Sequence, residues 1–159
     1  DGKPARIIAK LNALVEPQII QALYAAARDG VESDLIVRGM CALRPGMPGI
    51  SERIRVRSVI GRFLEHTRAY CFHNGGKQEV YLSSADWMER NFFRRVEVAF
   101  PLLSSELRKR VLADLESYLR DNTNAWIMQS DGSYQRIEPG KEAPYSAQQA
   151  LLEQLAQQS

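Results

Sequence analysis

The sequence lacks several features that define whole classes of protein. No apolar run approaches the roughly 20 residues needed to span a bilayer, and the first residues show neither a charged n-region nor an apolar h-region. Only two cysteines occur, Cys41 and Cys71, each in an apolar stretch without a Cys or His at metal-ligand spacing. This favours reduced, buried thiols over a disulfide or a zinc site. We therefore expect a cytoplasmic protein without a transmembrane segment.

Familiar nucleotide-binding and catalytic signatures are missing as well. There is no Gly-x-x-x-x-Gly-Lys-Ser/Thr loop, no Gly-x-Gly-x-x-Gly and no Gly-x-Ser-x-Gly elbow. A nucleotide, if bound, is thus not held by a Walker or Rossmann loop. Internal repeats and low-complexity segments are also absent, and 159 residues suit one domain with one core.

Positive charge is concentrated in the middle of the chain. Residues 34–110 hold 14 Lys and Arg against 8 Asp and Glu, a balance of +6. Residues 1–33 balance at zero and residues 111–159 at −4, which gives the net charge of +2. Twelve of the 14 cations are arginine, whose planar guanidinium suits bidentate bonds to phosphate. The bias indicates phosphate recognition, although composition alone is explained more simply by a solvated surface with ordinary ion pairs.

The hydrophobic periodicity and the turn residues predict an α/β fold with a mixed sheet. The first predicted elements are a strand over 6–11, a helix from Pro17 to Asp29-Gly30, a strand over 35–37 and a strand with Arg53, Arg55 and Arg57 on one face. They are followed by a hairpin of 68–72 with 79–83, a strand over 96–100, and a helix capped by Ser104 or Ser105 with Leu107, Val111, Leu115 and Leu119 buried. The last predicted elements are a weak hairpin at 126–128 and Tyr134 and a helix from about Ser146. His73, in the hairpin turn 73–76, is expected in an exposed loop. The polar composition after Asp121 predicts a C-terminal extension over 122–159.

The first three elements form a βαβ unit, which implies parallel strands and a right-handed crossover. Ligands of such sheets gather at the carboxyl ends of the strands, where Lys10, Asn12 and Arg38 fall. Lys10 and Asn12 are two residues apart and so share one face of an extended segment. These three side chains are therefore candidates for one binding site.

A second group of candidates flanks the predicted hairpin. His66 and Arg68 precede its first strand, and Ser83-Ser84-Ala85-Asp86-Trp87 ends its second strand. An imidazole can attack phosphorus or move protons, and an adjacent cation can stabilise charge on a transferred group. Each piece also has an ordinary explanation, because a lone His is usually structural and Ser84 with Asp86 can form a capped turn.

Several strings in order closely resemble the C-terminal domain of the polyphosphate kinase family. They are DLIVRG at 34–39, LRPGMPG at 43–49, IRVRS at 54–58, RFLEH at 62–66, YLSSADWM at 81–88 and RVEV at 95–98. The resemblance runs from about Ile8 to about Leu119 and implies a phospholipase D-like domain, flanked by helices, over residues 1–121. It further implies an enzyme that reversibly transfers the terminal phosphate of ATP to inorganic polyphosphate.

The resemblance also implies roles for individual residues. Arg38 and His66 would contact the phosphates of ATP or ADP, with His66 as an auxiliary acid or base. The other implied positions are Arg68, Lys10 and Asn12 for phosphate binding and Arg55, Arg57 and Arg95 for a polyphosphate path. Arg68 stands where the phospholipase D pattern has Lys, and Ser83-Ser84-Ala85-Asp86 where it has Gly-Ser-x-Asn. These departures argue against His66 as the covalent nucleophile.

The phosphohistidine segment and the magnesium-binding positions of the family lie on a preceding domain and match nothing in this sequence. We therefore expect no metal ligands in this chain, Mg²⁺ in the complete enzyme, and little kinase activity from these residues alone. Preceding domains of the same enzyme and a homo-oligomer are the implied partners, and membrane association of the complete enzyme stays open.

Two alternatives to this interpretation remain. One is a non-catalytic module that binds polyanions or nucleic acid, although such platforms expose aromatic side chains and Phe63, Tyr70, Phe72 and Tyr81 are predicted in the core. The other is a phospholipase D-like phosphodiesterase with His66 in covalent catalysis.

Overall fold

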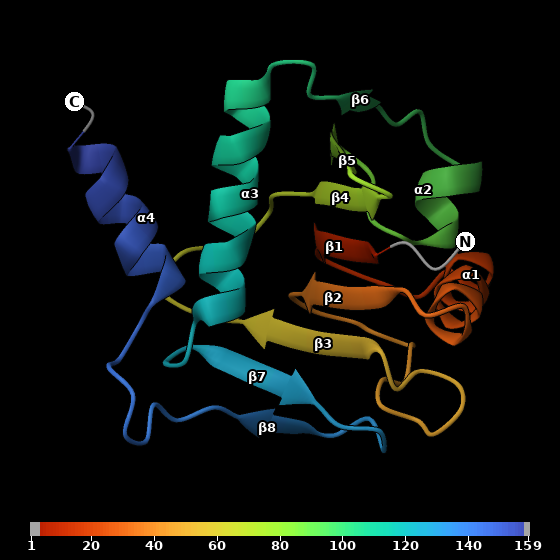
Figure 1. Ribbon diagram of the computed structural model, residues 1–159, viewed down its shortest axis with the longest axis horizontal. Helices are drawn as coiled ribbons and strands as arrows, with labels where there is room; N and C mark the ends of the chain where they lie inside the picture. The colour runs from red at the N-terminus through yellow and green to blue at the C-terminus, as the bar shows by residue number, and fades with distance from the viewer. Residues whose placement is uncertain (1–3, 158–159) are drawn as a thin grey trace.

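Eight strands form one mixed sheet with helices on both faces (Figure 1). The computed structural model describes residues 4–157. The elements in chain order are β1 (Ala5–Leu11), α1 (Pro17–Arg28), β2 (Glu32–Val37), β3 (Ile54–Val59), β4 (Ala69–Asn74), β5 (Lys77–Ser83), α2 (Glu89–Phe93), β6 (Ala99–Pro101), α3 (Ser105–Arg120), β7 (Ala125–Met128), β8 (Tyr134–Arg136) and α4 (Ala147–Ala156). The strand order is β6-β5-β4-β1-β2-β3-β7-β8, with β1, β2 and β3 parallel and the other neighbours antiparallel.

The predicted βαβ unit is confirmed, and local chemistry explains its ends. Pro17 begins α1, where its fixed φ suits the first helical turn, and the Glu16 carboxylate accepts a hydrogen bond from the Ile19 amide at 2.7 Å. After α1, Gly30 has a φ of 95°, a conformation that glycine adopts without strain. The chain can therefore turn back at once and pair β2 with β1.

Two apolar layers cover the two faces of the sheet. Ala9 and Leu35 belong to the cluster that includes Leu23 of α1, whereas Ile8 and Ile36 belong to the cluster that includes Leu115 of α3. Consecutive strand residues point to opposite faces, so the apolar runs of β1 and β2 supply both layers. The central strands are consequently buried on both faces, with the loops at their ends.

The hairpin of β4 and β5 is also confirmed, but its turn is shorter than predicted. Gly75 and Gly76 have φ values of 55° and 96°, as a two-residue turn between antiparallel strands requires. His73 lies within β4 and is half-buried, so its assignment to an exposed loop was wrong. Likewise, the strand predicted over 96–100 is reduced to Ala99–Pro101.

The last third of the chain completes both the sheet and one helical layer. Ser104 caps α3 through the Leu107 amide at 3.4 Å, as predicted, but the Leu107 side chain is half exposed rather than buried. β7 pairs with β3, β8 pairs with β7, and α4 packs beside α3 (Figure 1). Residues 125–136 thus extend the same sheet, and the boundary at residue 121 stays a prediction. No helix within residues 4–157 has both the length and the apolar character needed to cross a membrane.

Candidate functional site

Polar side chains gather at the edge of the sheet where β1 and β2 end. Asn12 directly follows β1 and Arg38 directly follows β2. β4 runs antiparallel to β1, with Lys10 opposite Ala69, so the start of β4 and the end of β5 reach the same edge. The loops 60–68 and 84–88 therefore converge with the ends of the parallel strands, which is where ligands of such sheets bind.

A buried ion pair joins these loops. Arg68 Nη2 lies 2.8 Å from Asp86 Oδ2, and both side chains are largely buried. Asp86 Oδ1 also accepts the backbone amides of Asn12 at 2.7 Å and Ala13 at 3.3 Å. Burial acts to raise the pKa of Asp86, but the hydrogen bonds from Arg68 and from the two amides outweigh it and lower the pKa. The charged carboxylate therefore fastens the loop after β5 to the end of β1.

Arg68 also positions His66 at the surface. Arg68 Nη1 lies 3.4 Å from Nδ1 of His66 and Nη2 lies 3.5 Å from Nε2, and Nη1 donates to the His66 carbonyl at 3.2 Å. The imidazole is exposed, whereas the guanidinium beneath it is mostly buried. The hydrogen bond to Asp86 acts to raise the pKa of Arg68 further, which secures a fixed positive charge next to the ring.

His66 and Arg68 line an open cavity of about 640 Å³. Arg90 and Arg95 also reach it, and within residues 4–157 neither of them forms a salt bridge, although Arg95 is close enough to Glu97 to help lower the pKa of that carboxyl. Glu97 stands in the same wall and accepts hydrogen bonds from the Ser84 hydroxyl and the Asn91 amide, which lower its pKa. Because Asp86 offsets Arg68 and Glu97 offsets one of Arg90 and Arg95, one net positive charge remains in the cavity.

Arg38 lines a neighbouring cavity of about 260 Å³. The other walls are formed by residues 59–65, including Arg62 and Phe63. The Arg38 carbonyl accepts a hydrogen bond from Ser58 at 2.8 Å, and no carboxylate among the described residues pairs with the guanidinium. Phe63 is about half exposed, so its predicted place in the core was wrong.

Lys10 belongs to a buried network rather than to an open cavity. Its ammonium lies 2.9 Å from Glu65 Oε2 and 4.7 Å from the ring centre of Tyr118, and its side chain is only 3% exposed. Burial, with help from Arg38 and Arg68, lowers the pKa of Lys10 despite the opposing effect of Glu65. The Asn12 amide, oriented as its neighbours require, donates to the Glu65 carbonyl at 2.7 Å and accepts from Arg68 at 3.1 Å. The structure thus joins Lys10 and Asn12 to the loop that carries His66.

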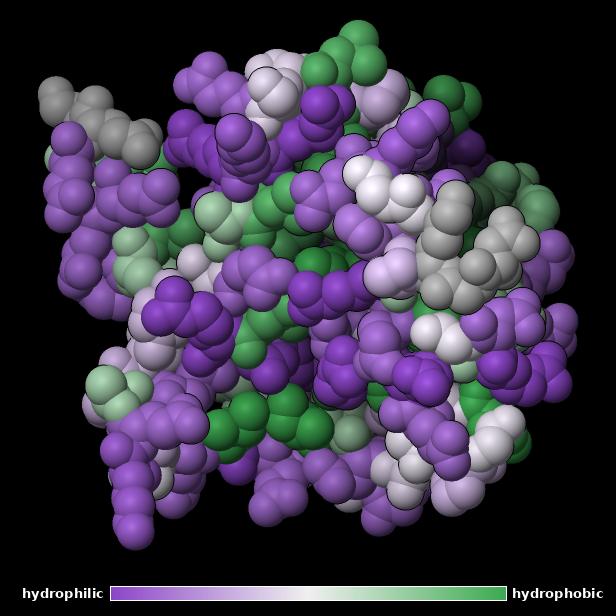
Figure 2. Space-filling model, viewed as in Figure 1, coloured by the Kyte–Doolittle hydropathy of each residue, from purple (hydrophilic) through white to green (hydrophobic). Residues whose placement is uncertain are grey.

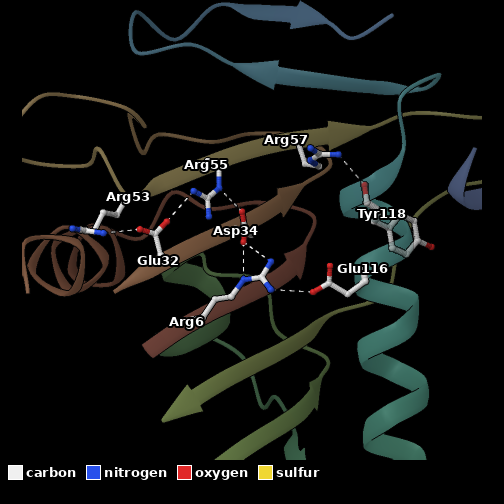
Figure 3. Close-up of polar contacts among 8 residues, drawn as sticks. All are labelled: Arg6, Glu32, Asp34, Arg53, Arg55, Arg57, Glu116 and Tyr118. Carbon is white, nitrogen blue, oxygen red and sulfur yellow. Dashed lines mark hydrogen bonds and ion pairs between the residues drawn. The ribbon is translucent and has the colours of Figure 1, made fainter. Parts of the chain in front are cut away.

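Arg55 and Arg57 lie elsewhere on the sheet, in the arrangement drawn in Figure 3. Arg55 donates to Asp34 at 2.7 Å and to Glu32 at 2.8 Å, and Arg57 donates to the Tyr118 carbonyl at 3.1 Å. They line a separate cavity of about 340 Å³ together with Arg6 and Glu116. Arg55 and Arg57 therefore do not line the cavity of His66. Arg95, the third residue of the predicted polyphosphate path, does line it.

Sequence reasoning missed several residues of this site. Arg90, Asn91 and Glu97 line the cavity and were not predicted, and Asp86, predicted within the 83–87 candidate loop, was given no role as the partner of Arg68. Their spacing gives no periodic signal, because α2 is a single short helix and residues 94–98 are irregular. The one available signal was the position of Asp86 at the end of β5, directly opposite the basic pair of His66 and Arg68.

The donors of the cavity do not suit a divalent cation. Mg²⁺ prefers oxygen ligands, yet Asp86 and Glu97 are both occupied by hydrogen bonds and the other charged groups are cationic. Among residues 4–157 no cluster of three or more His, Cys, Asp or Glu side chains has a geometry suited to a metal ion. The site is instead suited to an anion with several oxygens.

Comparisons with known proteins agree on one family. A family model described as polyphosphate kinase C-terminal domain 2 matches residues 1–148. The polyphosphate kinase of Pseudomonas aeruginosa is 58% identical over 156 residues, which are 98% of this chain and 23% of that relative. That of Xylella fastidiosa is 60% identical over 156 residues, or 97% of this chain and 22% of the relative. The chain therefore spans less than a quarter of the length of these relatives.

Solved structures show the same relationship. The crystal structure of polyphosphate kinase from Porphyromonas gingivalis superposes with a TM-score of 0.94 and 44% identity, over 99% of this chain and 24% of that one. Nuc from Salmonella typhimurium, a phospholipase D family member, gives a TM-score of 0.58 at 17% identity and covers 86% of this chain. At this identity Nuc confirms only the phospholipase D-like fold.

Proposed function

We propose a phosphate-binding role within a phosphotransferase, on the premise that the chain belongs to the polyphosphate kinase family and contains its C-terminal domain 2. In this role the edge cavity binds the phosphates of ATP or ADP and of polyphosphate during reversible transfer of the terminal phosphate. The substrates are proposed from the family, since the chain covers only part of its relatives.

One observation carries the proposal most directly. Arg68, Arg90 and Arg95 converge with His66 on a cavity whose only carboxylates are held by hydrogen bonds. Arginine binds phosphate oxygens through two parallel hydrogen bonds, and fixed cations stabilise charge on a transferring phosphoryl group. In phosphoryl transfer the protein contributes mainly positioning and charge neutralisation, and the side chains of this cavity are suited to both.

Within this proposal, the candidate residues act in different ways. His66 is exposed over Arg68 and serves as an auxiliary acid or base at a phosphate oxygen, while Arg38 binds nucleotide phosphate from the neighbouring cavity. Arg95, joined by Arg90, contacts polyphosphate. Lys10 and Asn12 act indirectly, because both are bonded to residues of the loop 65–68.

The complete reaction requires groups from outside this chain. We propose that the phosphorylated residue and Mg²⁺ are held by other parts of a longer polypeptide, as the relatives' lengths allow. A cytoplasmic location belongs to the same proposal, since ATP is the substrate and Cys41 and Cys71 are both free thiols. A homo-oligomer of the complete enzyme is likewise proposed.

An apolar surface beside the cavity supports contacts with such other parts. Large apolar side chains between α2 and the start of α3 are exposed, with Val96 fully exposed and Leu103 nearly so. Figure 2 shows apolar side chains at the top of the molecule, over the connection from β6 to α3 located in Figure 1. Exposed apolar patches of this kind mark interaction surfaces.

The first experiment compares binding of ATP and of polyphosphate to the wild-type chain, Arg38→Ala and His66→Ala across a salt series. Both substitutions should weaken binding while circular dichroism stays unchanged, and binding should weaken with salt because phosphate contacts are screened. Arg53→Ala is the matched control, since Arg53 is exposed and pairs with Glu32 away from the cavity. Equal binding by all four proteins would show that the fold is retained without the proposed site.

The same samples separate the rival functions. Inorganic polyphosphate should displace a bound oligonucleotide if phosphate recognition dominates, whereas a nucleic-acid binder that stacks bases should keep much of its affinity at high salt. Phe63 provides an exposed aromatic ring for such stacking, which makes this control necessary. A phosphodiesterase would instead form a covalent phosphohistidine at His66, which mass spectrometry detects.

A further inference from the structure

The C-terminal helix α4 is hydrogen-bonded to the loop that forms one wall of the Arg38 cavity. Gln148 of α4 accepts a hydrogen bond from the Phe63 amide at 3.0 Å and donates to the Phe63 carbonyl at 2.8 Å. Its Nε2 also donates to Glu65 Oε1 at 2.7 Å. All three bonds span more than 80 residues of sequence, and the side chain is 8% exposed. A single amide thus fixes the main chain at Phe63 and the side chain of Glu65.

Glu65 links Gln148 to residues at and near the end of β1. Besides Gln148, its carboxylate contacts the Lys10 ammonium at 2.9 Å and accepts the Tyr118 hydroxyl at 2.9 Å. Its carbonyl accepts the Asn12 amide. A buried carboxylate with this many partners has one stable position, because each partner that moved would leave a buried polar group unsatisfied. His66 follows Glu65 directly, so its backbone is fixed at the same point.

Gly61 leaves the space that this contact needs. A Cβ at position 61 would lie 2.4 Å from Gln148 Oε1 and 2.9 Å from its Cδ, both closer than non-bonded atoms approach. Position 61 therefore admits only glycine while the Gln148 amide stays where it is. The close approach gives a second way to disturb the contact without touching α4 itself.

We propose that Gln148 is a positioning residue for the phosphate site, through which α4 sets the geometry of Arg62 and His66 and of the wall that faces Arg38. The wall residues 59–65 line the Arg38 cavity, and the loop they belong to leads into His66. The proposal rests on the phosphate-binding function given above and assigns the C-terminal helix a part in it. Gln148 itself touches no ligand in this scheme.

The test measures polyphosphate binding and amide hydrogen exchange in the wild-type chain and in Gln148→Ala, Gln148→Glu, Gly61→Ala and Gln149→Ala. Gln148→Ala should weaken polyphosphate binding about tenfold, because the displaced 61–66 segment would cost the site about one charge-assisted hydrogen bond to phosphate. It should also speed exchange of the amides at 61–66. Gln148→Glu keeps the size and the acceptor but lacks the N–H donors, so it should not rescue binding. Gln149→Ala, which loses only an exposed bond to Glu153, is the control and should match the wild type.

Gly61→Ala covers the case in which Gln148→Ala fails to fold. It should reproduce the loss of binding because it displaces the same amide, and combining it with Gln148→Ala should add little. Faster exchange at 61–66 with unchanged polyphosphate affinity would overturn the proposal, as would unchanged exchange and affinity in both single variants. A wild-type chain that binds no polyphosphate would instead overturn the proposed function, so the two failures are distinct.

Discussion

Two arginine-rich regions of the same sheet use their charge in opposite ways. In the amino-terminal half of the parallel strands, Arg6 and Arg55 share Asp34, and each bonds a second carboxylate as well (Figure 3). At the carboxyl edge, Arg68 is paired with Asp86, but Arg90 and Arg95 form no salt bridge among residues 4–157. The first region is a self-contained ion-pair network, while the second retains positive charge for a ligand.

The comparison shows that arginine content alone does not locate an anion site. Arg55 and Arg95 are both exposed residues of the basic middle segment, yet Arg55 is ion-paired with Asp34 and Glu32, whereas Arg95 faces the edge cavity without a salt bridge. What separates them is the number of carboxylates within reach, which for Arg55 depends on the register that places Asp34 opposite it. Free positive charge is thus a property of the folded arrangement.

The largest effect should follow from breaking the pair that organises the edge cavity. Asp86→Ala leaves Arg68 buried without its counter-ion and removes the acceptor of the Asn12 and Ala13 amides. The free energy of unfolding should fall by about 3–5 kcal/mol, and polyphosphate binding should be lost. Urea titration measures the loss, with Glu89→Ala as the control because its ion pair with Arg94 is exposed. A small change would show that Arg68 finds another partner.

Removal of the unpaired arginines should affect binding without affecting stability. Arg90→Ala and Arg95→Ala should each weaken polyphosphate binding about tenfold, as the loss of a charge-assisted hydrogen bond predicts. Arg55→Ala should leave binding unchanged, since Asp34 and Glu32 already occupy that guanidinium. Isothermal titration at constant ionic strength tests both statements. If Arg55→Ala weakened binding as much, the contrast between the two regions would fail.

A pH titration should reveal the network in the amino-terminal half. Burial acts to raise the pKa of Asp34, but hydrogen bonds from Arg55 and Arg6 outweigh it and lower the pKa. A carboxyl with a lowered folded-state pKa stabilises the protein above its ordinary pKa of about 3.9, and this stability is lost as the pH falls through the lowered value. Unfolding free energies should therefore decline below about pH 4, and less steeply in Asp34→Asn.

The charged carboxylate of Asp114 should have the opposite effect on stability in the same pH titration. Burial raises its pKa, with Arg110 opposing weakly, so the charged form is disfavoured in the folded chain. Asp114→Asn should therefore be more stable than the wild type at neutral pH. For the prediction on Asp34, equal pH profiles of Asp34→Asn and the wild type would contradict the role assigned to Arg6 and Arg55.

The smallest effect is expected at Arg53, because its carboxylate partner Glu32 is partly exposed, whereas Arg55 also bonds the buried Asp34. Arg53 pairs with Glu32 at 2.7 Å, but half of its side chain is exposed to solvent. Arg53→Ala should lower the free energy of unfolding by less than about 0.5 kcal/mol and should leave phosphate binding unchanged. A thermal melt beside Arg55→Ala measures the difference. A loss larger than that of Arg55→Ala would reverse the proposed order within the network.

Much of the fold could be predicted from local signals. Pro17 and Gly30 set the limits of α1, Gly75 and Gly76 fix the hairpin, and Ser104 caps α3. These features depend on the φ preferences of single residues and on hydrogen bonds within a few positions, so the sequence displays them directly. The predictions for His73, Phe63 and Leu107 failed because the burial of a side chain depends on which elements cover it.

The candidate site divides along the same line. The sequence alone predicted Arg38 at the carboxyl end of a parallel strand and His66 and Arg68 just before the first strand of the hairpin, because a βαβ unit and a hairpin leave few choices for that edge. Only the tertiary structure decided that Arg68 pairs with Asp86, that Lys10 is buried against Glu65, and that Gln148 holds the loop at Phe63. These contacts join residues far apart in the chain, and their existence depends on distances of a few ångströms that no local pattern encodes.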